Sequence, residues 1–291
     1  NFFGSGEKVN VDLTLSTLEQ SLGAKMKKPF FMRDDQSLLL NAEVKRSDTD
    51  AYEEIGFGTG FDISRQLNKR LFASVGSKID ISQIKEDNEE TKTFGLLSPH
   101  TSLKYDSRDD KLDPHKGWLL SADLEGFVDV LGEASPFVKS ELGAQTYYEV
   151  NKRLVLAGRT KIGTIAGTET DDIPATERFF AGGGGSVRGF GHQEIGPQES
   201  DGDPAGGRSL FEASFETRLK FTDTLGMVAF VDTGHVGDKV IPTFDSLSIG
   251  AGVGARYYTD FGPLRLDVGV PLSGDENTDQ NFQVYISIGQ A

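Results

Sequence analysis

The stretch LFEASFETRLK, residues 210–220, alternates between two kinds of side chain along most of its length. One set is mainly apolar and comprises Phe211, Ala213, Phe215, Thr217 and Leu219. The other set is charged and comprises Glu212, Glu216, Arg218 and Lys220. A period of two residues is typical of a β-strand, whose successive side chains point to opposite faces. The stretch therefore predicts a strand with one apolar and one charged face.

The same alternation recurs along the chain and predicts about fourteen strands. They cover residues 8–16, 18–28, 36–46, 52–64, 69–82, 91–107, 116–127, 137–149, 153–164, 208–220, 224–232, 246–258, 262–271 and 281–290. Lengths of about 9–13 residues fit tilted membrane strands better than soluble strands of about 5–6 residues. No segment of ten or more residues predicts a helix. One connection, about 165–207, is much longer than the others, and long connections in compact folds are usually functional.

Alternation alone fits both a soluble sheet and a membrane barrel. In the first the apolar face packs in a core, whereas in the second it meets lipid and the polar face lines a lumen. The long strands, the persistent charged face and aromatic residues near strand ends, such as Trp118 and Tyr148, favour the barrel. A hydrophobic content of 36% is compatible with it, because only every second strand residue faces lipid.

Composition and spacing argue against several functional classes. The net charge of −15 argues against a nucleic-acid partner, which would require a basic face. Without cysteine the chain has no thiolate metal site, and its four histidines lack the spacing of a zinc site. The acidic segment 106–113 lacks the spacing and glycine of a calcium loop, so a polar turn is preferred. We therefore predict no enzyme, no cofactor and no metal site.

The glycine-rich segment GGGGSVRGF, residues 182–190, is the sharpest local motif. It lacks the Gly-Lys-Ser/Thr ending of a phosphate-binding loop, and no helical pattern follows as a dinucleotide site would require. A flexible linker is the simple alternative. Apolar neighbours such as Phe179, Phe180 and Val187 argue against it, because a solvated linker does not need them.

Together with its preceding residues, this segment resembles the signature of the BamA/TamA superfamily of outer-membrane assembly barrels, the bacterial surface antigen family. The resembling stretches are RFFAGG and SVRGF at 178–183 and 186–190, YDSRD at 105–109, FVDTG at 230–234 and GPLRLD at 262–267. The last of these, with VPL at 270–272, is closest to the TamA branch. The resemblance implies an all-β, antiparallel transmembrane barrel in the bacterial outer membrane. The family has sixteen strands, so residues 1–291 would be the C-terminal barrel domain without its first two strands and the preceding POTRA domains.

The resemblance also implies where the long loop lies. It would fold into the lumen and place Arg188, Gly189 and Phe190 on the inner wall, where Glu216 and Asp232 would receive the arginine. A buried guanidinium is costly unless carboxylates pair with it, which makes such a lumenal pairing physically reasonable. Glu212 is a reserve partner. The alternative is that these are solvated lumen charges, each contributing little.

The implied function is an outer-membrane protein assembly or insertion factor, similar to a translocation and assembly module subunit. It would template the strands of client outer-membrane proteins, such as autotransporters, at a lateral seam. Its partners would be these clients, the lipid bilayer and a TamB-like inner-membrane protein. The seam strand would present Phe282, Val284, Ile286 and Ile288. The alternative is a polypeptide secretion channel or diffusion pore, which would need a free lumen and not a tightly paired loop.

Overall fold

The computed structural model describes residues 4, 6–86, 90–244, 246–259, 262–273 and 282–288 of the chain. Fourteen strands and two short 3-10 turns make up its regular structure. The strands are β1 (Lys8–Leu15), β2 (Glu19–Pro29), β3 (Gln36–Asp48), β4 (Glu53–Gln66), β5 (Leu71–Lys85), β6 (Lys92–Asp106), β7 (Gly117–Asp129), β8 (Phe137–Asn151), β9 (Leu154–Ala166), β10 (Ser209–Lys220), β11 (Leu225–Gly237), β12 (Ser248–Thr259), β13 (Gly262–Ser273) and β14 (Gln283–Ile288). The turns are η1 (Thr170–Asp172) and η2 (Ala175–Glu177). No described helix has the length and apolarity needed to cross a membrane.

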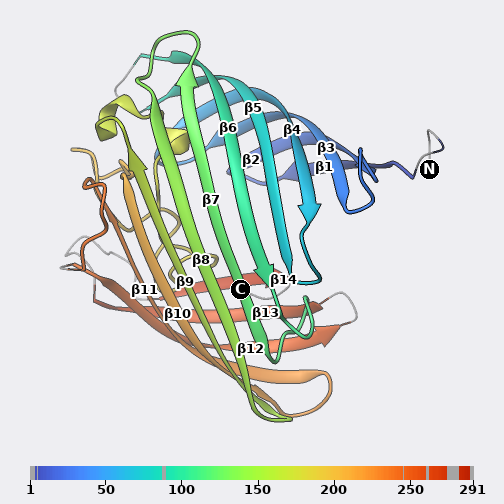
Figure 1. The fold of residues 1–291 in the computed structure, drawn as a ribbon. Coiled ribbons are helices and arrows are strands. Elements are labelled where there is room, and N and C mark those ends of the chain that lie inside the picture. Colours follow the sequence, from blue (N-terminus) through green and yellow to red (C-terminus); the bar gives the residue numbers. More distant parts are fainter. Residues whose placement is uncertain are drawn as a thin grey trace. The chain divides into compact units, whose positions relative to one another are not determined.

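The strands follow one another in sequence order in a single fourteen-stranded sheet, from β1 to β14 (Figure 1). Neighbouring strands run antiparallel, as the registers of β1–β5 and β9–β14 show. The expected antiparallel all-β fold is confirmed, with every expected strand present. The largest difference is β11, expected to end at Asp232, which continues to Gly237 because its last five residues pair with the start of β10. Of the last expected strand, positions 281, 289 and 290 lie outside the described residues.

Two compact units divide the chain. The first unit comprises residues 1–104, 122–140 and 165–178, and so contains β1–β5. The second unit comprises residues 105–121, 141–164 and 179–291, and so contains β10–β14 and most of the long loop.

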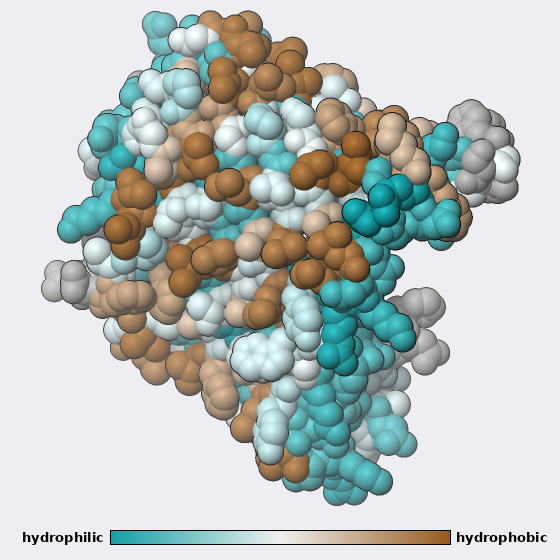
Figure 2. Space-filling model, viewed as in Figure 1, coloured by the Kyte–Doolittle hydropathy of each residue, from teal (hydrophilic) through white to brown (hydrophobic). Residues whose placement is uncertain are grey.

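The first unit buries polar side chains and exposes apolar ones. One row of paired residues crosses its five strands, each member opposite the next: Leu13, Leu22, Val44, Phe57 and Ile81. Each of these is about half exposed or more, and apolar side chains also form patches on the face shown in Figure 2. The opposite face buries Ser21, Glu54 and Ser82. Water-soluble sheets show the reverse distribution, and an exposed apolar face of this extent suits lipid.

A cation introduced into this apolar face should weaken the fold in a bilayer. Phe61 lies near the middle of β4, is 43% exposed and pairs with Leu40 of β3. We expect Phe61→Arg to lower the free energy of unfolding by about 2–4 kcal/mol, because a lipid-facing charge is most costly near the bilayer midplane. The measurement is urea unfolding of the full-length protein in phospholipid vesicles. Gln66→Arg, at the end of the same strand, is the control, and an equal effect of both changes would contradict the lipid-facing assignment.

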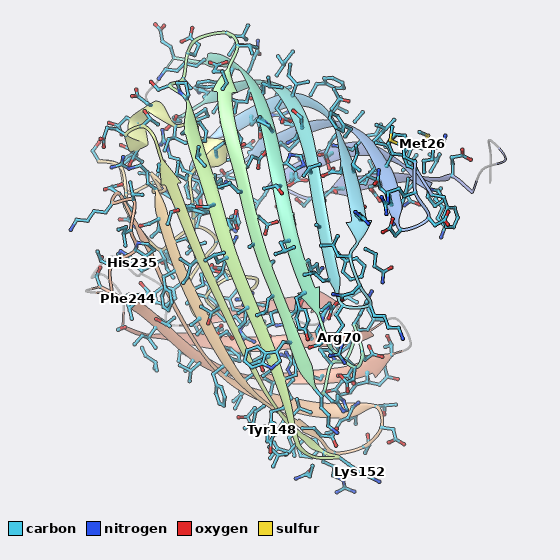
Figure 3. All side chains as sticks on the ribbon, viewed as in Figure 1. Met26, Arg70, Tyr148, Lys152, His235 and Phe244 are labelled. Atoms are coloured by element: carbon cyan, nitrogen blue, oxygen red, sulfur yellow. The ribbon has the colours of Figure 1, made fainter. Side chains whose placement is uncertain are left out.

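The second unit repeats this inverted pattern. Phe215, Val231 and Val253 are exposed on successive strands, whereas the opposite face buries charged residues such as Glu216 and Asp232. Tyr148 projects from β8 close to Lys152, which lies in the short β8–β9 turn (Figure 3). An outward tyrosine near a strand end is typical of the aromatic girdle at a membrane interface. The buried charged face is the face that the long loop meets, because Arg188 of the loop contacts both Glu216 and Asp232.

Candidate functional site

The long loop is packed against itself and against the charged face of the second unit. Its base is closed by two backbone hydrogen bonds of 2.9 Å between Phe179 and Gly207. A second bridge joins Ala181 to Ile195. The side chains of Phe179, Val187 and Phe190 are all buried. This part of the loop is a folded element rather than a free glycine linker.

Arg188 at the loop tip is only 2% exposed and lies against three carboxylates. Its Nε and Nη2 donate to the two oxygens of Asp232 on β11, at 2.7 and 2.9 Å. Its Nη1 lies 2.7 Å from Glu216 on β10 and 3.3 Å from Asp267 on β13. The guanidinium also sits 3.5 Å from the ring centre of Phe230, which adds a cation–π contact. One side chain thus connects the loop to three strands.

Further arginines join the same carboxylates. Arg218 donates to Glu216 at 2.8 Å, and Arg265 lies 3.1 Å from Asp267. Arg256 also binds Asp267, with one of its contacts at 3.2 Å. We call these seven residues the arginine network: Arg188, Arg218, Arg256, Arg265, Glu216, Asp232 and Asp267. Four arginines against three carboxylates leave an excess of one positive charge in a buried region, and buried charges of this kind depend strongly on their partners.

The neighbouring carboxylates keep the guanidinium of Arg188 protonated. Burial alone would lower the pKa of its guanidinium. Hydrogen bonds to Asp232 and the negative charges of Asp232, Glu216 and Asp267 outweigh burial and raise the pKa above its ordinary value. The loop tip therefore carries a permanent positive charge, and its attachment does not switch with pH through the arginine.

The backbone of the loop tip also lies directly on the sheet. Gly250 of β12 faces the carbonyl oxygen of Arg188 so closely that a Cβ at this position would overlap it. On the other side of the tip, Arg159 of β9 donates two hydrogen bonds of 2.7 Å to the carbonyls of Gly185 and Ser186. A side chain larger than hydrogen at Gly250 would displace the backbone that positions Arg188. Backbone contacts and ion pairs thus hold the same loop segment, residues 185–188, on the sheet.

The structure brings the expected loop residues together, with one difference in their partners. Arg188 contacts both Glu216 and Asp232, and Gly189 and Phe190 follow it on the sheet. Glu212, the reserve partner, binds the hydroxyl of Ser186 instead of the arginine. Asp267 was missed as a partner, although it lies on the polar face of the expected strand 262–271. Its only signal in the sequence is this alternation, which does not tell which strand reaches the loop.

The expected seam residues lie on β14 and immediately before it. Val284, Ile286 and Ile288 of β14, together with Phe282, are all exposed, and Ile286 is 83% exposed. Tyr285, between two of them in sequence, points to the opposite face and contacts the loop. β14 ends the sheet order and pairs with β13 from Gly269 opposite Gln283 to Leu264 opposite Ile288.

The acidic segment between β6 and β7 forms a hydrogen-bonded turn. One carboxylate oxygen of Asp109 accepts backbone N–H groups of Asp110, His115 and Lys116, each at 3.0 Å. Partial burial would raise the pKa of Asp109, but these donors outweigh it and hold the pKa below its usual range. The carboxylate thus caps the turn through backbone donors.

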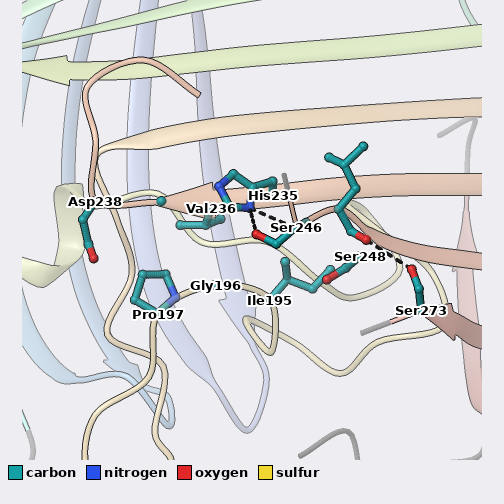
Figure 4. Close-up of a pocket in the computed structure, with 11 residues that line it drawn as sticks. Ile195, Gly196, Pro197, His235, Val236, Asp238, Ser246, Ser248 and Ser273 are labelled. Atoms are coloured by element: carbon teal, nitrogen blue, oxygen red, sulfur yellow. Dashed lines mark hydrogen bonds between the residues drawn. The ribbon is translucent and has the colours of Figure 1, made fainter. Parts of the chain in front are cut away.

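A hollow of about 420 Å³ lies where the loop passes the ends of β11 and β12 (Figure 4). His235 occupies its wall and donates from Nδ1 to the carbonyl of Ser246 at 3.1 Å, in the arrangement where that nitrogen carries the proton. Ile195, Gly196 and Pro197 supply the loop side. Across the described residues no group of three histidine or acidic side chains is arranged to hold a metal ion.

Comparison with known proteins gives consistent relatives. A family model described as the Omp85 superfamily domain matches residues 1–291. The outer membrane protein assembly factor BamA of Nitratidesulfovibrio vulgaris is 25% identical over 304 residues, which cover 100% of this chain and 38% of that protein. A sorting and assembly machinery component 50 homolog of Bos taurus is 26% identical over 225 residues, covering 72% of this chain and 46% of that protein. The chain thus spans less than half the length of these relatives.

Solved structures show the same fold. BamA from Haemophilus ducreyi lacking POTRA domains 1–3 superimposes with a TM-score of 0.83 at 17% identity, covering 98% of this chain and 64% of that one. CdiB from Acinetobacter baumannii gives a TM-score of 0.65 at 16% identity, covering 97% and 53%. At these identities the likeness concerns the fold, which is that of a BamA-like β-barrel.

Proposed function

The chain belongs to the Omp85 superfamily, and on this premise we propose that it is the membrane-embedded part of an outer-membrane protein assembly or insertion factor. Its relatives are named as assembly and sorting components, not as enzymes. It is an outer-membrane β-barrel protein of this superfamily, and its exposed apolar strand faces meet lipid. Its clients are other outer-membrane proteins.

The attachment of the loop tip by Arg188 is the observation that carries this proposal. One guanidinium joins the loop to β10, β11 and β13, next to the strand that ends the sheet order. A buried pairing of this kind is costly to break, because each released charge would remain in a poorly hydrated region. The loop therefore acts as a fixed support beside β14. A secretion channel would instead require this loop to move whenever cargo passes.

In the proposed mechanism β14 templates the client strand. An incoming strand adds to its edge by main-chain hydrogen bonding, which is the mode called β-augmentation. The outward residues Val284, Ile286 and Ile288 are apolar, so a strand added beside them continues a lipid-compatible face. No nucleotide is needed, because pairing each backbone group within lipid removes the large cost of leaving it unsatisfied.

We further assign the chain to the TamA branch of the family, with autotransporters as clients and a TamB-like inner-membrane protein as partner. The support for this finer assignment is the segment GPLRLD at 262–267 followed by VPL at 270–272. In the structure this segment forms β13, which carries Asp267 toward the loop and pairs with β14. Co-purification of the full-length protein with such a partner tests the assignment independently of the mechanism.

Cysteine crosslinking tests strand templating directly, because the chain has no cysteine of its own. Single cysteines would replace residues 282–288 one at a time in the full-length protein in outer membranes. A stalled autotransporter client would carry single cysteines along its terminal strand. We expect crosslinks that move in register along the two strands and are strongest at alternate positions, because paired strands place every second side chain on the same face.

A matched set of cysteines at Leu38, Leu40 and Ala42 of β3, on the face that carries the exposed Val44, controls for chance collision, since β3 already has neighbours on both sides. Crosslinks confined to the charged face of the second unit, for example at Ser214, whose hydroxyl donates to Asp232, would support the channel instead. Equal crosslinking from β3 and β14 would also contradict templating.

A further inference from the structure

Tyr285 is the inward-facing residue at the centre of β14 and it touches the loop tip. Its hydroxyl donates to the carbonyl of Phe190 at 2.7 Å. The same oxygen accepts the backbone N–H of Gly189 at 2.9 Å. A phenol can donate one hydrogen bond while accepting another, so one side chain satisfies two consecutive loop residues. We call this contact the Tyr285 bridge.

The ring of Tyr285 is held as closely as its hydroxyl. A Cβ at Gly184 would lie only 2.8 Å from the ring atom Cδ1, so only glycine allows the ring to rest on the loop there. The loop thus meets Tyr285 at both ends of the side chain, through Gly184 at the ring and through Gly189 and Phe190 at the hydroxyl. The ring contact therefore depends on the absence of a side chain at Gly184, which distinguishes it from a loose surface contact.

The bridge and the arginine network attach the loop to different strands. Arg188 connects it to β10, β11 and β13 by ion pairs, whereas Tyr285 connects it to β14 by neutral hydrogen bonds. Neutral hydrogen bonds typically contribute less than bonds to charged groups. The loop is therefore held firmly on the inner strands and more weakly on the end strand.

β14 is held to its neighbour by backbone pairing. Within the described residues its register with β13 covers the six pairs from Gly269 opposite Gln283 to Leu264 opposite Ile288. Its outward side chains are exposed and pack little against protein. A side-chain contact to a fixed support on the inner face is accordingly a large part of what positions this strand.

We infer that the Tyr285 bridge couples the seated loop to the position of β14, so that the end strand is released while the arginine network keeps the loop in place. This inference rests on the proposed function, because β14 is the strand that would template the client. Tyr285 is a positioning residue: it holds the strand on which pairing takes place. Separation of β14 from the loop costs two neutral hydrogen bonds and one ring contact, and leaves all ion pairs of Arg188 intact.

The test is hydrogen–deuterium exchange of the full-length protein in lipid, without any client. We expect Tyr285→Phe to speed exchange of the amides of residues 283–288 by about 10-fold, equivalent to about 1.4 kcal/mol. Gly184→Ala should have the same direction of effect, because it displaces the ring without removing the hydroxyl. Tyr147→Phe is the matched control: it removes the hydrogen bond of 3.0 Å to Gln145 on β8 and should leave β14 unchanged.

Cleavage by trypsin after Arg188 reports separately on loop seating, because the buried arginine is protected only while the loop is held. We expect protection in Tyr285→Phe to equal that of the unmodified protein. Unchanged exchange of β14 in both Tyr285→Phe and Gly184→Ala would overturn the inference. Loss of trypsin protection in Tyr285→Phe would overturn it as well, since the phenol would then merely seat the loop.

The client crosslinks described above distinguish failure of this inference from failure of the proposed function. Faster exchange of β14 in Tyr285→Phe without any client crosslink to β14 would support the bridge and contradict templating. Client crosslinks to β14 with unchanged exchange would support templating and contradict the bridge.

Discussion

Arg188→Ala is expected to lower the free energy of unfolding of the full-length protein in lipid by about 3–5 kcal/mol, the range for removing one partner of a buried ion pair. Its removal leaves Asp232 without the two bonds of 2.7 and 2.9 Å that now satisfy both of its oxygens. Glu216 retains Arg218, and Asp267 retains two arginines, so the loss falls mainly on Asp232. The hydroxyl of Ser214, which donates to Asp232 at 2.6 Å, cannot replace a charge.

The loop itself should detach in this variant. Without the guanidinium, the tip loses its ion pairs with β10, β11 and β13. It keeps the two hydrogen bonds from Arg159, the contact with Tyr285, the bond from Ser186 to Glu212 and the backbone N–H of position 188 on Asp232. We therefore expect trypsin to cleave the loop after Arg208, which is now partly buried at the base of the loop, at a rate well above that of the unmodified protein. Unfolding by urea in phospholipid vesicles measures the stability, and timed proteolysis measures the release.

Two further variants make the experiment decisive. Arg188→Lys keeps the charge but cannot bind both oxygens of Asp232 in the parallel geometry of a guanidinium, so an intermediate loss is expected. Arg33→Ala removes an exposed pair with Asp35 in the β2–β3 turn and should change stability by less than about 1 kcal/mol. If Arg188→Ala had no larger effect than Arg33→Ala, the charges around the loop would be solvated and the proposed support for β14 would be lost.

The sequence predicts the strands well because their physical cause is local. Each strand alternates between lipid-facing and inward residues, and this period is visible within a window such as 210–220. The prediction from alternation fails where a strand continues into residues that do not alternate between apolar and polar, as at the end of β11 from Thr233 to Gly237. There the strand is extended by its neighbour: Ser209 to Ala213 of β10 supply the pairing that the local pattern does not reveal.

The site is less accessible to sequence reasoning because it is assembled across strands. Glu216 and Asp232 can be proposed because they follow the loop on the next two strands. Asp267 lies 79 residues from Arg188, and its participation depends on the register that places it opposite Gly254, where the missing side chain leaves room for the carboxylate. The contact of Tyr285 with Gly189 is equally hidden in the sequence, because the two residues lie 96 positions apart. Alternation tells which face a residue occupies, but only the pairing of all intervening strands tells which residues meet.

Asp267→Asn is the second change for which a large effect is expected, again about 3–5 kcal/mol of lost unfolding free energy. Asp267 is shared by Arg188, Arg256 and Arg265, so it balances more positive charge than any other carboxylate of the network. Arg256 and Arg265 stand directly opposite each other on β12 and β13. An asparagine of the same shape leaves these two like charges adjacent and raises the network from one to two excess positive charges. Repulsion, rather than a cavity, is the cause of the expected loss.

A second substitution separates these causes. Adding Arg256→Met to Asp267→Asn restores the original excess of one charge and removes the repelling pair, so we expect at least half of the lost stability to return in a double-mutant cycle. Arg218→Met is the control, because it also restores the charge count but pairs with Glu216 and not with Asp267. Rescue by Arg256→Met alone would show that local contacts across β12 and β13 hold the loop, whereas equal rescue by both would assign the effect to the total charge of the charged face of the second unit. No rescue by either would mean that Asp267 acts through its hydrogen bonds to Arg188, and that β13 itself depends on the seated loop.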